Sequence, residues 1–202
     1  MATRASTLFG SDVSLQTPPK WASGQTIRPD YAILDASAVT TTATRLYYVP
    51  MFFPRAESFS GIRTYNQGTG DNGETYRCGI YEESTNGGPG SLLQDCGEVT
   101  LTGAAAVRTL AQSFSISTPG WHYLAMHFNS DAAMYRMYLG ATAAQIQRAQ
   151  LFGDYETLQN SNTSTAAKHF AYVDTAYGAL ASTAVAPTNG DWVCPSIAVY
   201  KA

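Results

Sequence analysis

The sequence predicts an all-β fold, a jelly-roll sandwich of about eight antiparallel strands. Runs rich in aromatic and β-branched residues follow one another from Arg45 to Phe128, and Pro, Gly and Asn interrupt them at the short intervals typical of turns. The 202 residues suffice for one all-β core with an appendage. We therefore expect a sandwich domain over residues 41–202, preceded by an extended N-terminal arm over residues 1–40.

The predicted arm lacks strand periodicity and is rich in Thr, Ser, Ala and Pro. Pro18-Pro19 and Arg28-Pro29 favour extended or turn backbone, because the residue before a proline is restricted to that region. The arm nevertheless carries apolar side chains that disordered tails usually lack, so we expect them to bury against a neighbouring subunit. These docking residues are Leu8, Phe9, Trp21, Ile27 and Tyr31.

Four strands are expected in the first half of the domain. Pro50 inside the first of them predicts an edge position or a bulge, because proline cannot donate a hydrogen bond to the strand ladder. The loop Ser84–Gly90 contains glycines that accept the positive φ angles needed to reverse a chain, so it predicts a hairpin between the third and fourth strands. The four strands are Leu46–Phe53, Ser58–Tyr65, Tyr76–Glu82 and Leu92–Leu101.

The second half of the domain adds further strands and one short helix. Ser117–Gly120 combines a proline at one turn position with a glycine at the left-handed one, which predicts a second tight reversal. Thr142–Leu151 lacks Gly and Pro and spaces its apolar residues as a helix does. The strands expected here are Val107–Ile116, Trp121–Phe128, Met134–Leu139, His169–Asp174 and Trp192–Tyr200.

Charge and composition argue against several kinds of partner. The 12 Lys and Arg residues are outnumbered by 15 Asp and Glu, so no basic excess exists to neutralise a nucleic acid. The apolar run from Leu46 to Phe53 is interrupted by Pro50 and is far shorter than the roughly 20 residues of a membrane helix. The start of the chain has no apolar core of signal-peptide length. We expect neither nucleic-acid binding, nor membrane insertion, nor Sec export.

No pattern of catalytic or metal-ligating residues is recognised, so we expect no enzymatic activity, no metal and no cofactor. Asp71, Asn72 and Glu74 superficially resemble a calcium loop, but the twelve-residue spacing of an EF-hand is missing. His122 and His127 differ in parity along one strand, which places them on opposite faces of a sheet. Neither a Gly-x-Ser-x-Gly elbow nor a recognisable pair of catalytic carboxylates occurs.

One group of aromatic and polar residues offers a platform for a sugar ring. Trp192 beside Asp191 and Asn189 would supply an apolar ring face with a polar rim. The simpler interpretation, which we favour, is that these aromatic side chains fill the core or a trimer interface. The candidate ligand-binding residues are Trp192, Asp191, Asn189, Tyr155, Tyr172 and Tyr177.

Four motifs occur in a characteristic order along the domain. They are RLYYVPMFFPRAESFSGI at 45–62, CGIYEESTNGGPGSLL at 78–93, PGWHYLAMHF at 119–128 and AYGALASTAVAP at 176–187. Together they resemble a jelly-roll module of tailed-bacteriophage fibre, spike and tail proteins, over roughly residues 45–202. Two features depart from that family: Ala181 stands where a proline is frequent, and a long insert follows Leu139. The functions of individual loops are therefore not carried over.

The resemblance implies a virion structural protein on the particle surface, assembled in the cytoplasm of the host bacterium. Such proteins are commonly homotrimeric fibres or spikes on the head or tail that contact capsid or tail proteins and present loops to a host polysaccharide. One alternative is a purely architectural capsid-decoration or tail-adaptor protein with no host ligand. Another is a lectin-like carbohydrate-binding module, which the low charge and abundant Tyr, Asn and Thr favour.

The cysteines allow one disulfide. Cys78 and Cys96 stand at nearly equal distances from the predicted turn and could face each other across two strands, and a disulfide there could contribute roughly 3 kcal/mol. Because the resemblance implies assembly in a reducing cytoplasm, and because buried cysteines pack as small hydrophobic residues, we expect reduced thiols instead.

Overall fold

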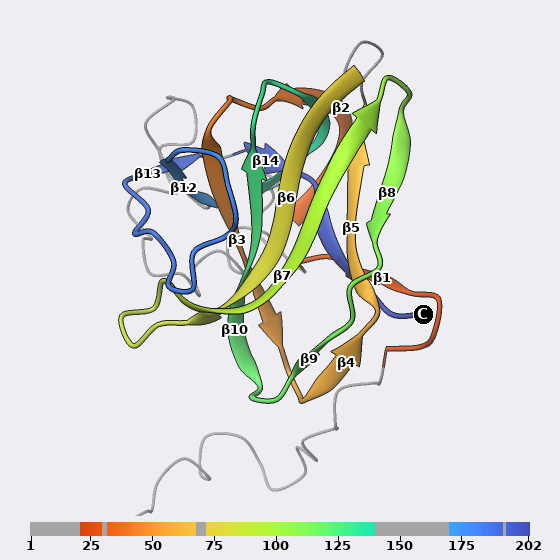
Figure 1. Cartoon of the computed structure of the whole chain (residues 1–202). Helices are drawn as coiled ribbons and strands as arrows, with labels where there is room; N and C mark the ends of the chain where they lie inside the picture. Colours follow the sequence, from red (N-terminus) through yellow and green to blue (C-terminus); the bar gives the residue numbers. More distant parts are fainter. Residues whose placement is uncertain (1–20, 30–31, 68–71, 140–169, 192) are drawn as a thin grey trace, which may run out of the picture.

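A computed structural model describes residues 21–29, 32–67, 72–139, 170–191 and 193–202. These residues form antiparallel strands and turns, without any helix. Two curved sheets face each other around a common core (Figure 1). The predicted all-β class and antiparallel sandwich are thereby confirmed, whereas the jelly-roll connectivity is not established by the described strand order and stays a prediction. The helix predicted over Thr142–Leu151 lies outside the described residues.

The first sheet has six strands, and its centre is a ladder of two long aromatic strands. These central strands are β3 and β10, which pair from Phe53 with Gly120 to Leu46 with His127. In spatial order the sheet comprises β13 (Asn189–Asp191), β12 (Phe170–Asp174), β3 (Arg45–Phe53), β10 (Gly120–Phe128), β6 (Asn72–Glu83) and β7 (Pro89–Thr102).

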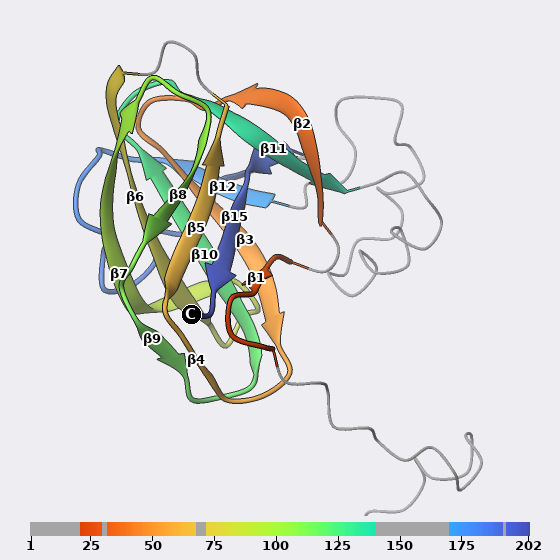
Figure 2. The ribbon, with the colours of Figure 1, turned by 90° about the vertical axis from the view of Figure 1, so that its right-hand side faces the viewer.

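The second sheet has seven strands and closes the other side of the core, with β1, β15, β5 and β8 side by side in Figure 2. A separate two-stranded ladder of β4 (Glu57–Phe59) and β9 (Phe114–Ile116) lies at one end of the sandwich. The seven strands are β1 (Thr26–Ile27), β15 (Ile197–Tyr200), β5 (Gly61–Asn66), β11 (Ala133–Leu139) and β14 (Val193–Pro195), with β2 (Ala32–Thr40) paired to β11 and β8 (Ala106–Leu110) paired to β5.

Side chains of β10 point alternately to the two faces of the six-stranded sheet, as strand geometry requires. Leu124, Met126 and Phe128 face inward and belong to the main core between the sheets. Tyr123 and Ala125 face outward and belong to a second cluster of buried residues. The sheet is therefore buried on both faces, which explains why both parities of this strand are apolar in the sequence.

The hairpin predicted around Ser84–Gly90 is confirmed. The amide of Ser84 donates to the carbonyl of Gly88 at 2.7 Å, and Gly87 has a φ of +79° that favours glycine. The expectation for Pro50 is wrong, because β3 is an inner strand and its ladder with β10 passes through Pro50 without a bulge. The proline is accommodated because the pairing of β3 with β12 ends at Tyr48.

Two predicted strands are each divided in the structure, at a point where two backbones approach closely. The segment Ser58–Tyr65 forms β4 and β5, and the segment Val107–Ile116 forms β8 and β9. A Cβ atom on Gly61 would lie only 2.0 Å from the carbonyl oxygen of Leu110. Only glycine fits this contact, which lies where one pair of strands ends and the other begins.

The described part of the predicted arm belongs to the sandwich, which corrects the predicted boundary. Thr26–Ile27 pairs with Tyr200 and Val199 of β15, and Ala32–Thr40 pairs along β11. Ile27 is 8% exposed within the main core, and the ring of Trp21 packs 5.6 Å from that of Phe59. The expectation that Trp21 and Ile27 bury against a neighbouring subunit is therefore wrong: they bury against their own chain. Leu8, Phe9 and Tyr31 lie outside the described residues.

Candidate functional site

The outer face of the six-stranded sheet is covered by an irregular segment that follows β12, residues 175–188, which we call the strap. It is the blue loop at the left of Figure 1. Its backbone is fastened to the start of β7, where Leu92 donates to the carbonyl of Ser182 and Ala184 donates to that of Gly90, each at 2.8 Å. The strap thus pairs with β7 as a short extra strand would, and lies over the sheet.

Tyrosines dominate the cluster that the strap covers, which we call the outer cluster. The hydroxyl of Tyr48 donates to the carbonyl of Val185 at 3.1 Å, and that of Tyr81 donates to the carbonyl of Ala181 at 3.0 Å. Burial raises the pKa of Tyr81 to about 12. These hydroxyls are therefore neutral donors that hold the strap in place. The outer cluster comprises Leu46, Tyr48, Tyr81, Tyr123, Ala125, Val173 and Leu180.

Close contact between the strap and the sheet depends on Gly79 of β6. A Cβ atom there would lie 2.3 Å from Cδ1 of Leu180 and 2.7 Å from the carbonyl oxygen of Gln94. Because the second of these atoms belongs to the backbone, a larger residue could not be accommodated by a rotamer change alone. Gly79 is therefore the point at which the sheet admits the side chain of Leu180.

The two tyrosines of the predicted sugar platform that the structure describes lie on opposite faces of the six-stranded sheet. Tyr172 packs against the inward-facing Tyr47, with 6.0 Å between the two ring centroids. The guanidinium group of Arg45 lies 3.9 Å from the ring centroid of Tyr172. Tyr177 lies on the outer face, 5.1 Å from the ring of His127. They do not form one platform. For Asn189 and Asp191 only the backbone is described, within β13, and Tyr155 and Trp192 lie outside the described residues.

His127 and Tyr177 anchor the start of the strap. The imidazole of His127 is 3% exposed, and its Nε2 atom donates to the carbonyl of Thr175 at 3.2 Å. Burial lowers the pKa of His127, an effect that its backbone hydrogen bonds oppose. The hydroxyl of Tyr177 donates to Glu98 at 2.5 Å. His122, by contrast, contacts the inward-facing ring of Phe53, so the predicted opposite faces of the two histidines are observed.

A cross-strand aromatic pair lies farther along the same two strands. Phe52 of β3 and Trp121 of β10 are directly opposite each other, with ring centroids 5.1 Å apart and planes inclined by 59°. Phe52 is 49% exposed. Trp121 is half-buried and packs against the main core, which fixes its orientation. Among the aromatic side chains that the structure describes, Phe52 is the one that is exposed.

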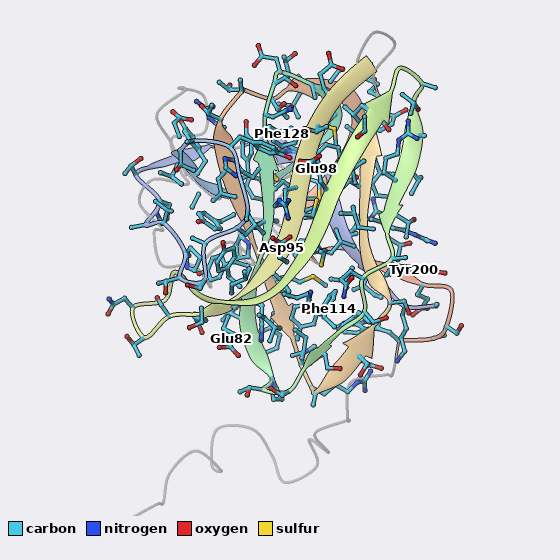
Figure 3. The ribbon with its side chains drawn as sticks, in the orientation of Figure 1. Glu82, Asp95, Glu98, Phe114, Phe128 and Tyr200 are labelled. Carbon is cyan, nitrogen blue, oxygen red and sulfur yellow. The ribbon has the colours of Figure 1, made fainter. Side chains whose placement is uncertain are left out.

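One carboxylate shares the face of this aromatic pair, and another lies on the opposite face. Glu82 pairs with the inward-facing His122, so its side chain belongs to the inner face of the sheet, and Figure 3 shows Glu82 at the lower end of β10. Glu83 follows at the end of β6, two residues after the outward-facing Tyr81, and so points to the face on which Phe52 and Trp121 lie. Glu83 is exposed, and neither carboxylate is ion-paired to a described residue.

Phe52, Trp121 and the exposed Glu83 form the candidate site, a shallow surface with two aromatic rings and an acidic rim. The negative ring faces attract C–H groups that carry partial positive charge, and a carboxylate accepts hydrogen bonds but donates none. The site can therefore hold a ligand that presents an apolar face beside hydroxyl or ammonium donors.

The described residues offer no other obvious chemistry. No group of three or more His, Cys, Asp or Glu side chains among them is placed to hold a metal ion. Cys78 and Cys96 are free and buried, as the reduced alternative predicted, and burial raises the pKa of Cys96 to about 12. The Cys194 side chain is buried as well. No helix in the described parts of the chain is long and apolar enough to cross a bilayer.

Comparison with known proteins does not assign a family. No protein-family model, no characterised protein and no solved structure matches the chain. The functional argument therefore rests on the geometry of the site and on the motifs in the sequence.

Sequence reasoning missed Phe52 and Trp121 because both stand inside strands that read as core. A usable signal was present: Phe52 shares its parity with Tyr48 on β3, and Trp121 shares its parity with Tyr123 on β10. Alternation alone places all four residues on one face. What it cannot give is the point at which the cover over that face ends.

Proposed function

We propose that this chain is a structural, non-catalytic subunit on the surface of a bacteriophage particle, as part of a fibre or spike on the head or tail, and that it helps the particle attach to a host surface polysaccharide. The observation that carries the attachment role is the cross-strand pair of the exposed Phe52 and the half-buried Trp121. Solvent-exposed aromatic rings held on a rigid sheet are the usual anchors of a recognition surface.

The virion role draws its support from the four motifs between residues 45 and 187, whose order resembles phage fibre and spike modules. The low charge of the chain also suits a surface that packs closely against copies of itself, since only 13% of residues are charged. We expect a homotrimer, as the resemblance to phage fibres and spikes implies, and a symmetric assembly would multiply a shallow site without new contacts. Size-exclusion chromatography with light scattering should give about three times 21.7 kDa.

Docking to other virion proteins is assigned to the segment before the sandwich. Because the described sheet includes Thr26–Ile27 and Ala32–Thr40, the docking arm is restricted to residues 1–20, which carry Leu8 and Phe9. Deletion of residues 1–20 should prevent incorporation into particles while the remaining domain keeps its β-sheet circular dichroism. A deletion variant that enters particles as well as the full chain would contradict this role of the arm.

The test of the proposed function uses bacteriophage particles propagated with this gene. Density-purified particles should contain the chain by mass spectrometry, and antibody-gold labelling should place it on the particle surface. Its absence from purified particles would contradict the virion role. Particles that carry Phe52→Ala and still attach to cells as well as the wild type would favour the architectural alternative, in which the chain has no host ligand.

A further inference from the structure

We propose that Phe52, Trp121 and Glu83 form a carbohydrate-binding subsite that selects neutral or amino-sugar residues and rejects acidic sugars. This inference rests on the proposed attachment role and names the ligand class of the same site. It differs from the platform around Trp192 expected from the sequence, whose described tyrosines lie on opposite faces of the sheet.

The two rings supply the apolar half of the subsite. Their centroids are 5.1 Å apart on directly paired residues and their planes are inclined by 59°, so a pyranose that rests its apolar C–H face on the exposed ring of Phe52 also meets the ring of Trp121 at its side. Trp121 packs against the main core on its buried side, and Phe52 is backed by the strand ladder of β3 and β10. The surface is thus formed before a ligand arrives, which lowers the entropic cost of binding.

The Glu83 carboxylate supplies the polar half and decides the charge of the ligand. Glu83 is exposed at the end of β6, on the face of the sheet that carries Trp121. Its charge acts on the hydroxyl group of Tyr123, two residues after Trp121 on β10. A carboxylate accepts bonds from sugar hydroxyls or an ammonium group, and it repels the carboxylate of a uronic acid.

The same carboxylate argues against a protein partner on this surface. The centres of protein–protein interfaces are depleted of charged residues, because a carboxylate that loses water without a partner costs free energy. A bound sugar leaves the acidic rim in contact with water. Where it does displace water from the carboxylate, its hydroxyl groups replace the lost hydrogen bonds one for one. A second copy of the chain is therefore an outcome of the test rather than the assigned occupant.

The subsite is shallow, so one copy should bind weakly. A single sugar ring on an open surface is expected to show a dissociation constant on the order of 1 mM. Several copies on one particle would raise the effective affinity by about 10²- to 10⁴-fold. Binding should therefore be measured on monovalent protein for specificity and on an assembled or bead-coupled form for avidity.

The experiment is a panel of neutral, amino-sugar and uronic-acid oligosaccharides presented to the bead-coupled protein, with intrinsic tryptophan fluorescence in solution as the second readout. Wild type should retain neutral and amino-sugar ligands and not the acidic ones. Phe52→Ala should lower retention by about 30-fold or more, whereas Phe52→Tyr should preserve it. The matched control is Val107→Ala, an equally exposed apolar residue on β8 of the other sheet, which should change nothing.

Glu83→Gln tests the selectivity separately. It should reduce retention of amino-sugar ligands by about threefold to tenfold and allow uronic-acid oligosaccharides to bind, because a neutral amide no longer repels them. Equal retention by wild type and Phe52→Ala would overturn the proposal, as would a wild type that prefers acidic sugars. A Phe52→Ala variant that changes only the oligomeric state would assign the surface to a second copy. None of these outcomes alters whether particles carry the chain, so failure of this inference is distinguishable from failure of the proposed function.

Discussion

Two groups of aromatic side chains lie on the same outer face of the six-stranded sheet but differ in their exposure to solvent. Tyr48 and Tyr123 are buried beneath the strap or the adjoining hairpin, and the hydroxyl of each donates to a backbone carbonyl. Phe52 and Trp121, farther along β3 and β10, pair with each other, and Phe52 faces solvent. The two groups share the same strands, the same face of the sheet and aromatic character. They differ in whether the strap or the adjoining hairpin covers them.

Tyr48 and Tyr123 stabilise the fold, whereas the fold presents Phe52, paired with Trp121, at its surface. Leaving half of a phenylalanine exposed forgoes roughly 2.5 kcal/mol, taking about 100 Å² at 25 cal/mol/Å². Tyr48, which is 0% exposed, shows that this chain can cover an outward-facing aromatic ring on the same strand. The exposure of Phe52 therefore agrees with a role in binding, and four measurements test the difference between the two groups.

The largest effect is expected at Tyr48. Tyr48→Ala should lower the free energy of unfolding by about 3–5 kcal/mol, because it leaves a cavity under the strap and removes the bond to Val185. Tyr48→Phe, which removes the hydroxyl alone, should cost only about 1 kcal/mol. Urea denaturation followed by circular dichroism measures both. A loss below 1 kcal/mol for Tyr48→Ala would mean that the strap does not bury this ring.

Gly79→Ala should have the next largest effect, about 1–3 kcal/mol, because its Cβ would overlap Leu180 and the backbone of Gln94. The matched control is Gly178→Ala in the strap itself, where nothing lies within 4 Å of the added atom. That control should be neutral or slightly stabilising. Thermal denaturation of the two variants side by side tests the contact, and equal melting temperatures would argue that the strap does not approach the sheet at Gly79.

Phe52→Ala should lower the free energy of unfolding by only about 1 kcal/mol, the range of a cross-strand pair at a surface. The same urea titration used for Tyr48 measures it. A loss comparable to that of Tyr48→Ala would place Phe52 among the residues that hold the fold together and would remove the contrast between the two groups.

A small dependence of stability on pH is expected from His127 under the strap. Its pKa is lowered in the folded chain from the ordinary value of 6.5, so the unfolded chain takes up the proton more readily. The stability is therefore complete above pH 6.5 and falls as the pH drops below it. His122 is shifted in the same direction, so His127→Gln should remove part of the slope between about pH 6.5 and 5.

Glu57 does not obscure this window. Its pKa is lowered from 4.5 by Lys201 first and by Arg55 as well, so its contribution to stability is lost only as the pH falls below 4.5. Urea midpoints of wild type and His127→Gln at several pH values measure the effect. An unchanged slope in the variant would show that His127 is not buried as a neutral side chain.

The sequence could predict the central strands because their local signals agree with their surroundings. β3 and β10 were placed to within one residue, since aromatic and β-branched residues fill them and Pro or Gly bounds them. β1 and β2 were missed because their Thr- and Ala-rich segments carry little strand signal, and their pairing depends on β15 and β11, which follow far along the chain. Such long-range pairing is not encoded locally.

The site was less predictable than the fold. The motif at residues 176–187 was recognised as a closing segment, but an irregular strap has no periodicity from which its position over the sheet could be derived. Without the strap, Tyr48 and Phe52 look equivalent in sequence. The predicted grouping of Tyr172 with Tyr177 was wrong for the same reason, since their separation onto two faces depends on where the chain leaves β12.

The most direct measurement is a crystal structure of the domain with a bound neutral oligosaccharide. We expect one sugar ring lying over Phe52 and Trp121, with a hydroxyl group within hydrogen-bond distance of Glu83. Density for the sugar at any other surface, with Phe52 and Trp121 covered by a second copy of the chain, would contradict it.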